Sequence, residues 1–168
     1  MNNIYYKLKE TKEDGTIILK KQIIDETKYD IIYKDNELIL KPKPLEIKIE
    51  KLEDFDKKKT IEFRNSQILS CYIDGKRPSN NKYFSILKDI YEIINSGKII
   101  TKNTKLNFET IEKNDKGFKY LKNIGISVQH KEAGFVFEEI LNQCIETGIV
   151  LRIEIEFVSG QIKKYFVN

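Results

Sequence analysis

The fold is decided first by residues 29–41, which read YDIIYKDNELILK. A two-residue turn at Asp35-Asn36 would lay the two alternating halves of this stretch side by side as antiparallel strands. In that register, apolar side chains face apolar side chains and opposite charges face each other. The predicted pairs are Lys34 with Glu37, Tyr33 with Leu38, Ile32 with Ile39, Ile31 with Leu40 and Asp30 with Lys41. The stretch therefore predicts a β-hairpin.

The segments around this hairpin show the same alternation of apolar and polar residues. Strands are predicted at residues 4–10, 16–24 and 45–50, and a further pair of strands at 60–73 around Asn65-Ser66. Lys41-Pro42-Lys43-Pro44 ends the hairpin ladder, because proline has no amide N–H to donate. Residues 1–75 are therefore expected to form an antiparallel meander.

Helical periodicity begins after a turn-rich break at residues 74–82. Ser79 or Asn80 is expected to cap a helix that ends near Gly97, and Asp115 to cap a short helix through Asn123. A third helix is predicted at about 131–147. Its apolar stripe consists of Phe137, Ile140, Leu141, Cys144 and Ile145. Residues 98–112 are expected to be extended, and 124–128 to form a brief strand.

The chain is predicted to close with a second hairpin. A Ser159-Gly160 turn would set Glu156 against Lys163 and Phe157 against Ile162. Strands thus flank the helices in sequence, and several form adjacent hairpins. This order favours an α+β fold: a mainly antiparallel β-meander in the N-terminal half, two or three helices, and a C-terminal β-hairpin. We expect a single domain over 1–168, with a β-rich subdomain at 1–75 and an α+β subdomain at 76–168 as the alternative.

The composition indicates origin and compartment. The chain holds 27 Lys but only 3 Arg, together with 28 Ile and 13 Asn, which is typical of AT-rich codons in a low-GC bacterium or its phages and plasmids. No apolar segment approaches the length of a bilayer span, and the first residues lack the apolar core of a secretory signal, so we expect a cytoplasmic protein with no membrane partner. Cys71 and Cys144 lie in apolar stretches and are predicted to be buried, with a disulfide as the alternative.

The charge is unevenly distributed. Residues 76–131 carry 12 basic and 5 acidic side chains, whereas residues 132–168 carry 3 basic and 6 acidic ones. Lysines with interleaved aromatic residues are typical of phosphate contacts and base stacking, and they also complement an acidic protein surface. The candidate binding residues are Lys76, Arg77, Lys82, Lys102, Lys105, Lys116, Lys119, Tyr120 and Lys122. Lys116, Lys119 and Lys122 would share one face of the short predicted helix.

Motifs for catalysis are weak. The eight glycines are dispersed singly, so no phosphate-binding loop is predicted. The single histidine, His130, is expected to be exposed or to cap a helix, and no residues have the spacing of metal ligands. Glu46-Ile47-Lys48, with Asp30 or Asp35, allows a metal-dependent nuclease as an alternative, and Asp54-Phe55-Asp56 reads as a charged loop. We therefore predict no catalytic residue, no metal and no cofactor.

Three functions follow, in decreasing order of support. The first is a non-enzymatic module of the inhibitor, immunity or phage and plasmid accessory type, which binds another protein, such as one with an acidic surface, through the basic segment. The second is a nucleic-acid-binding protein that uses residues 76–122. The third is a metal-dependent enzyme with dispersed carboxylates, so enzymatic activity is disfavoured without being decided. A homodimer is a further alternative for the charged patches.

Overall fold

The structure is a computed structural model that describes residues 2–11, 13, 17–25, 29–34, 37–55, 61–94 and 104–168. The chain divides into two compact units, Met1–Pro44 and Leu45–Asn168. The fold is α+β with largely antiparallel strands, as predicted. The turn-rich break at 74–82 lies inside the second unit, between a strand and a helix.

The strands described in the first unit pair two by two. β1 (Asn2–Thr11) pairs with β2 (Ile17–Asp25), and β3 (Tyr29–Lys34) pairs with β4 (Glu37–Pro42), both antiparallel. All five residue pairs predicted for the β3–β4 hairpin are present, from Lys34 with Glu37 to Asp30 with Lys41. Its predicted turn, Asp35-Asn36, lies outside the described residues.

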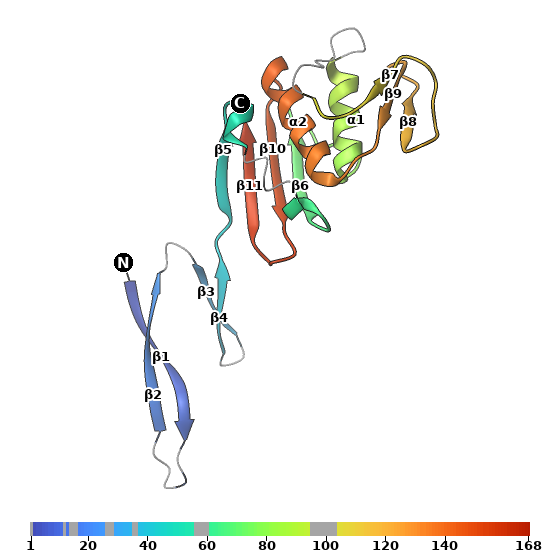
Figure 1. Cartoon of the computed structure of the whole chain (residues 1–168). Helices are drawn as coiled ribbons and strands as arrows, with labels where there is room; N and C mark the ends of the chain where they lie inside the picture. Colours follow the sequence, from blue (N-terminus) through green and yellow to red (C-terminus); the bar gives the residue numbers. More distant parts are fainter. Residues whose placement is uncertain are drawn as a thin grey trace. The chain divides into compact units, whose positions relative to one another are not determined.

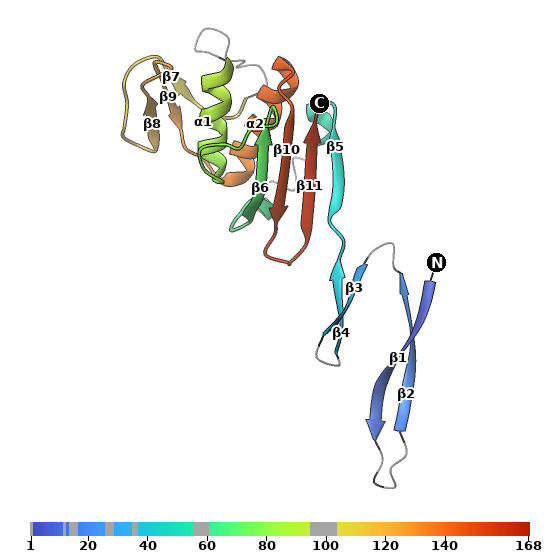
Figure 2. The same cartoon turned by 180° about the vertical axis from the view of Figure 1, so that it is seen from behind.

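The second unit is built on a four-stranded sheet. It contains β5 (Leu45–Ile49), β6 (Gln67–Ile73), β10 (Leu151–Glu156) and β11 (Ile162–Val167), in the order β5-β11-β10-β6 (Figures 1 and 2). β5 runs parallel to β11, while the other neighbours are antiparallel. Along β10, Leu151, Ile153 and Ile155 are buried and alternate with more exposed charged residues, so one face of the sheet is apolar.

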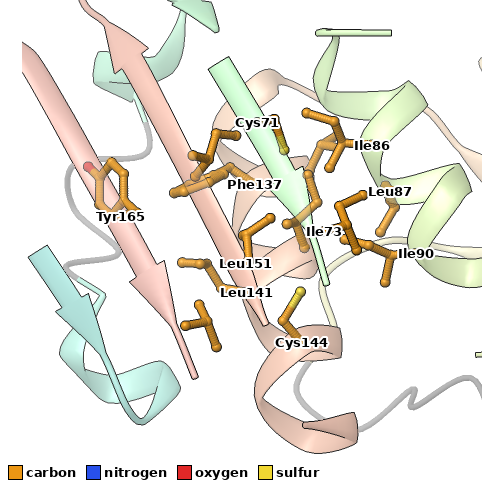
Figure 3. Close-up of a cluster of buried hydrophobic side chains, with 14 of the residues drawn as sticks. Cys71, Ile73, Ile86, Leu87, Ile90, Phe137, Leu141, Cys144, Leu151 and Tyr165 are labelled. Carbon is orange, nitrogen blue, oxygen red and sulfur yellow. The ribbon is translucent and has the colours of Figure 1, made fainter. Parts of the chain in front are cut away.

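Two helices cover that apolar face. α1 (Tyr83–Ile94) and α2 (Ala133–Thr147) pack against each other, and a short 3₁₀ helix, η1 (Leu52–Asp54), contacts α2. Figure 3 shows side chains of α1 and α2 meeting those of β6, β10 and β11 in one core. The predicted stripe of α2 is buried, with Ile145 partly exposed at its end. Among the described residues, no helix is long and apolar enough to cross a bilayer.

The ends of the helices differ in part from the prediction. α2 ends at Thr147 and is capped by Gly148, where φ is 72°, a left-handed conformation that glycine adopts readily. α1 begins at Tyr83, so Ser79 does not cap it. Instead, the Ser79 N–H and hydroxyl donate to the Asp89 carboxylate at 2.6 and 2.9 Å. Gly97, the predicted end of α1, lies outside the described residues.

The helix predicted at 115–123 is wrong. Lys116 and Gly117 both have positive φ, 48° and 80°, and the Phe118 N–H donates to the Asp115 carbonyl at 2.8 Å, so these residues form a tight turn. A strand follows the turn, β8 (Phe118–Leu121), which pairs with β9 (Ile126–Gln129). β7 (Phe108–Glu109) lies on the other side of β9. Local turn chemistry therefore overrides the helical spacing.

The first half of the strand pair predicted at 60–73 is also wrong. Residues 61–63 form a 3₁₀ turn, in which the Arg64 N–H donates to the Ile61 carbonyl at 3.1 Å. Ser66 holds the next turn by donating its N–H and its hydroxyl to the Phe63 carbonyl, at 3.2 and 2.8 Å. These bonds turn Phe63 into the core, where only 1% of it is exposed, so no strand forms before β6.

The C-terminal hairpin forms in a register shifted from the prediction. Glu156 pairs with Ile162, and Ile155 pairs with Lys163. The loop has three residues, because the Phe157 N–H donates to the Gln161 carbonyl at 2.9 Å and Gly160 takes a φ of 78°. A three-residue loop with glycine in the left-handed region is a common hairpin connection, and its extra residue accounts for the shift.

Candidate functional site

The structure separates the predicted binding residues into several groups. Lys76 and Arg77 follow β6 and line a hollow that also contains Asp89 and Glu92. The Arg77 guanidinium lies 5.8 Å from the centre of the Tyr72 ring, so it faces the sheet. Carboxylates in the same hollow weaken its attraction for an anion.

Lys105 has a structural role rather than a free surface position. Its Nζ lies 3.0 Å from Oε2 of Glu138, a side chain that is only 4% exposed. Its carbonyl accepts a hydrogen bond from the Lys131 ammonium. Lys105 therefore compensates a buried charge on α2, and its assignment as a binding residue stays a prediction.

The three basic residues around β8 do not share a helix face. Lys116 lies in the turn, Lys119 lies on the strand and Lys122 follows it, because the predicted helix does not form. Tyr120 is partly buried, and its backbone N–H donates to Asn114 Oδ1 at 2.9 Å. Lys102 lies outside the described residues.

Two of the predicted residues, Lys82 and Lys119, meet in a groove of about 480 Å³ between β6, β8 and the first turns of α1 and α2. We call this the cationic groove. Besides these two lysines it is lined by Ser66, Gln67, Ile68, Asn81, Tyr83, Phe84, Ser85, His130, Lys131, Ala133 and Val136. Three lysines and the histidine line it, and no carboxylate is among its described lining residues. The groove is therefore positively charged at neutral pH.

Phe84 contributes an aromatic ring to the cationic groove. The Lys119 Nζ lies 5.7 Å from the centre of its ring, and the His130 ring lies 5.1 Å from it at an angle of 40°. His130 is exposed, as predicted, and its backbone N–H donates to the Gly117 carbonyl at 2.7 Å. The turn at Lys116-Gly117 thus positions both β8 and His130 beside Phe84.

The Tyr83 side chain joins the cationic groove to the core. The Tyr83 hydroxyl lies 2.7 Å from Ser66 Oγ, and the Tyr83 ring packs against Phe63 and Phe137 of the core at 6.2 and 6.0 Å. Burial raises the pKa of the Tyr83 hydroxyl to about 12, so it stays neutral. The first turns of α1 and α2 add the partial positive charge of two helix N-termini.

Sequence reasoning missed three contributors to the groove. They are Phe84, His130 and Lys131, which were not predicted to bind a ligand. No pattern among their sequence neighbours indicates that they lie on the same surface. One signal was present: the Lys116-Gly117 dipeptide, flanked by alternating residues, is compatible with a hairpin turn and would have predicted β8 in place of a helix.

The described residues of the nuclease alternative belong to β3 of the first unit and to β5 of the second unit. Lys48 forms an exposed ion pair with Glu50 at 2.7 Å, and Asp30 lies on β3 of the other unit. Asp54 has a structural role, because its carboxylate accepts the N–H groups of Glu50 and Lys51, and these bonds lower its pKa. Over the described part of the chain, no group of three or more His, Cys, Asp or Glu side chains is placed to hold a metal. Asp35 and Asp56 lie outside it.

A buried polar cluster on α2 also has a structural explanation. Glu139 accepts hydrogen bonds from the Tyr91 hydroxyl at 3.1 Å and from the Gln143 amide at 2.7 Å. Burial raises the pKa of Glu139, and the hydrogen bonds from Thr104, Gln143 and Tyr91 partly oppose that rise. The cluster ties α1 to α2.

Both cysteines are free and buried, at 2% and 0% exposure, as the sequence predicts. Burial raises the pKa of Cys71 to about 12 and that of Cys144 further above its ordinary value of 9.0. We expect neither thiol of the native protein to react with Ellman's reagent at mildly alkaline pH, because the reactive species is the thiolate. In denaturant both should react at once. A rapid reaction of the native protein would contradict this packing.

A comparison of the chain with known protein families, with curated proteins and with solved structures finds no match. Any functional assignment therefore depends on the surfaces described above.

Proposed function

We propose that this protein acts by binding another protein, without enzymatic activity, and that the cationic groove receives an acidic segment of the partner. The single observation that carries the proposal is the lining of the groove, in which three lysines, a histidine and Phe84 occur together with no carboxylate among the described residues. Charges arranged in this way attract an acidic segment and orient it, while Phe84 offers an apolar contact.

The size and charge of the groove favour a protein over a nucleic acid as its ligand. A nucleic-acid surface usually neutralises many phosphates, and arginine supplies its strongest contacts. The groove has three lysines and no arginine, and the neighbouring hollow at Lys76 and Arg77 contains Asp89 and Glu92. A short acidic peptide segment fits this limited positive surface better than a long phosphate backbone.

The proposal is tested by charge reversal at Lys82 and Lys119. The probe is a fluorescein-labelled peptide of alternating glutamate and phenylalanine, titrated with the full chain at about 50 and 200 mM salt, a range over which ionic contacts weaken strongly. Each lost contact should cost about 1 kcal/mol, so the double variant Lys82→Glu/Lys119→Glu should bind at least about tenfold more weakly.

The matched control is Lys76→Glu/Lys122→Glu, which makes the same change in charge outside the groove and should weaken binding only slightly. Equal losses in the two double variants, or no peptide binding at low salt, would overturn the proposal. If single-stranded or duplex DNA bound more tightly than the peptide, and the double variant Lys82→Glu/Lys119→Glu abolished that binding, the groove would be a nucleic-acid site instead.

A further inference from the structure

The second candidate surface is the face of the four-stranded sheet opposite the helices. Its strand register places four side chains in one row: Lys48 on β5 is paired with Phe166 on β11, Phe166 with Arg152 on β10, and Arg152 with Tyr72 on β6. Cations and aromatic rings therefore alternate across the whole sheet. We call this row, extended by Arg77, the platform row.

The side chains of the platform row are accessible. Arg152 is exposed, and Tyr72 and Phe166 are partly exposed. Among the described residues, the Arg152 side chain forms no ion pair and no hydrogen bond, and the ion pair of Lys48 with Glu50 is exposed. Arg77 completes the row, because its guanidinium lies 5.8 Å from the centre of the Tyr72 ring. The exposed Lys48–Glu50 pair is worth little, so Lys48 remains available to a ligand. Arg77 also lines the hollow that contains Asp89 and Glu92, so its attraction for a phosphate is weaker.

The platform row also concentrates the scarcest cation of this chain. Two of the three arginines, Arg77 and Arg152, belong to it, although lysines outnumber arginines 27 to 3. Arginine binds phosphate with a planar fork and stacks on aromatic rings, which lysine does less well. Because lysine is the usual cation of this chain, the occurrence of two arginines beside exposed aromatic rings sets the platform row apart from the other basic surfaces.

The neighbouring row carries two carboxylates and one lysine. There Glu46, Lys164, Glu154 and Ser70 are paired across the same strands. Glu154 is engaged by Lys164 at 4.0 Å and by the Ser70 hydroxyl at 3.4 Å. A trough of about 750 Å³ includes this row together with Tyr72, Arg152 and Phe166 of the platform row. The trough also includes Asp74, whose carboxylate accepts the Val150 N–H at 2.9 Å. The carboxylates of the trough therefore lie in the neighbouring row and just after the end of β6, beside the platform row and not within it.

We infer that the platform row binds single-stranded nucleic acid, with bases stacked on Tyr72 and Phe166 and phosphates near Lys48, Arg152 and Arg77. Tyr72 and Phe166 lie two strands apart, about 10 Å, so successive or alternate bases of one strand can reach them. Bases in a duplex are already stacked on each other, so the aromatic faces select a single strand. The platform row and the cationic groove share no lining residue, so this inference is independent of the proposed function.

The test is an anisotropy titration of fluorescein-labelled oligo(dT) and oligo(U), each about 12 nucleotides long, with the full chain at about 50 mM salt. Stacking of one base is worth about 1–3 kcal/mol, so Tyr72→Ala and Phe166→Ala should each weaken binding by roughly 5-fold to 100-fold. Tyr72→Phe and Phe166→Tyr keep the ring and should bind nearly as the original chain does. Arg152→Ala should lower the salt dependence by about one phosphate contact.

The control is Lys119→Ala, a groove variant that should leave oligonucleotide binding unchanged. Thermal unfolding of each variant checks that the sheet is intact, and the ring-preserving variants keep the test valid if an alanine variant unfolds. Three results would each overturn the inference: no binding of either oligonucleotide, tighter binding of the matching duplex, or binding by Tyr72→Ala and Phe166→Ala as tight as that of the original chain. Comparison of oligo(dT) with oligo(U) then assigns the ligand as DNA or RNA.

Discussion

Replacement of Phe137 by alanine should lower the free energy of unfolding by about 3–5 kcal/mol, the range for deleting a buried phenylalanine side chain. Phe137 on α2 has no exposed surface. Its ring meets four aromatic rings: those of Phe55 at 5.7 Å, Phe63 at 4.8 Å, Tyr83 at 6.0 Å and Tyr165 at 5.0 Å. The variant would lose the contacts that join α2 to η1, to the turn before β6 and to β11.

Urea denaturation followed by far-UV circular dichroism measures this loss, and tyrosine fluorescence gives a second probe because the chain has no tryptophan. Phe137→Leu keeps much of the side-chain volume and should lose less, so it remains informative if the alanine variant does not fold. Val158→Ala, at a position 76% exposed, should change stability by at most about 0.5 kcal/mol. A Phe137→Ala effect as small as that of Val158→Ala would contradict the aromatic core.

Lys105→Ala should lower the free energy of unfolding by about 2 kcal/mol without weakening acidic-peptide binding. Removing one partner of a fully buried ion pair costs about 3–5 kcal/mol, because the other charge stays buried without its counter-charge. Here Glu138 is 4% exposed but Lys105 is 41% exposed, so solvent screens part of the interaction and the expected loss is smaller.

The double variant Lys105→Ala/Glu138→Gln tests that cause. Neutralising the buried carboxylate should recover most of the lost stability, and the difference between the double variant and the sum of the single variants measures the coupling. Lys122→Ala serves as the control, as an exposed lysine in the same basic segment. If Lys105→Ala instead weakened peptide binding at unchanged stability, Lys105 would act as a binding residue, as the sequence predicts.

The cationic groove was only partly predictable. Lys82 and Lys119 were expected to bind, but the charge count of residues 76–131 did not separate them from Lys105, which neutralises Glu138. Phe84 and His130 were missed because their ring contact joins residues 46 positions apart. Of the platform row, only Arg77 was among the predicted binding residues. The other four members come from strands that lie far apart in the sequence, and only the register aligns them.

The sequence by itself determined the class of fold, the β3–β4 register and the buried stripe of α2. Each depends on residues a few positions apart, whose alternation, helical spacing or turn chemistry sets which side chains can be buried together. Only the tertiary structure decided that β5 joins β11, that Lys105 meets Glu138 and that Tyr72, Arg152 and Phe166 lie in one row. These contacts join distant segments, and their formation depends on the packing of the whole second unit, which no local pattern encodes.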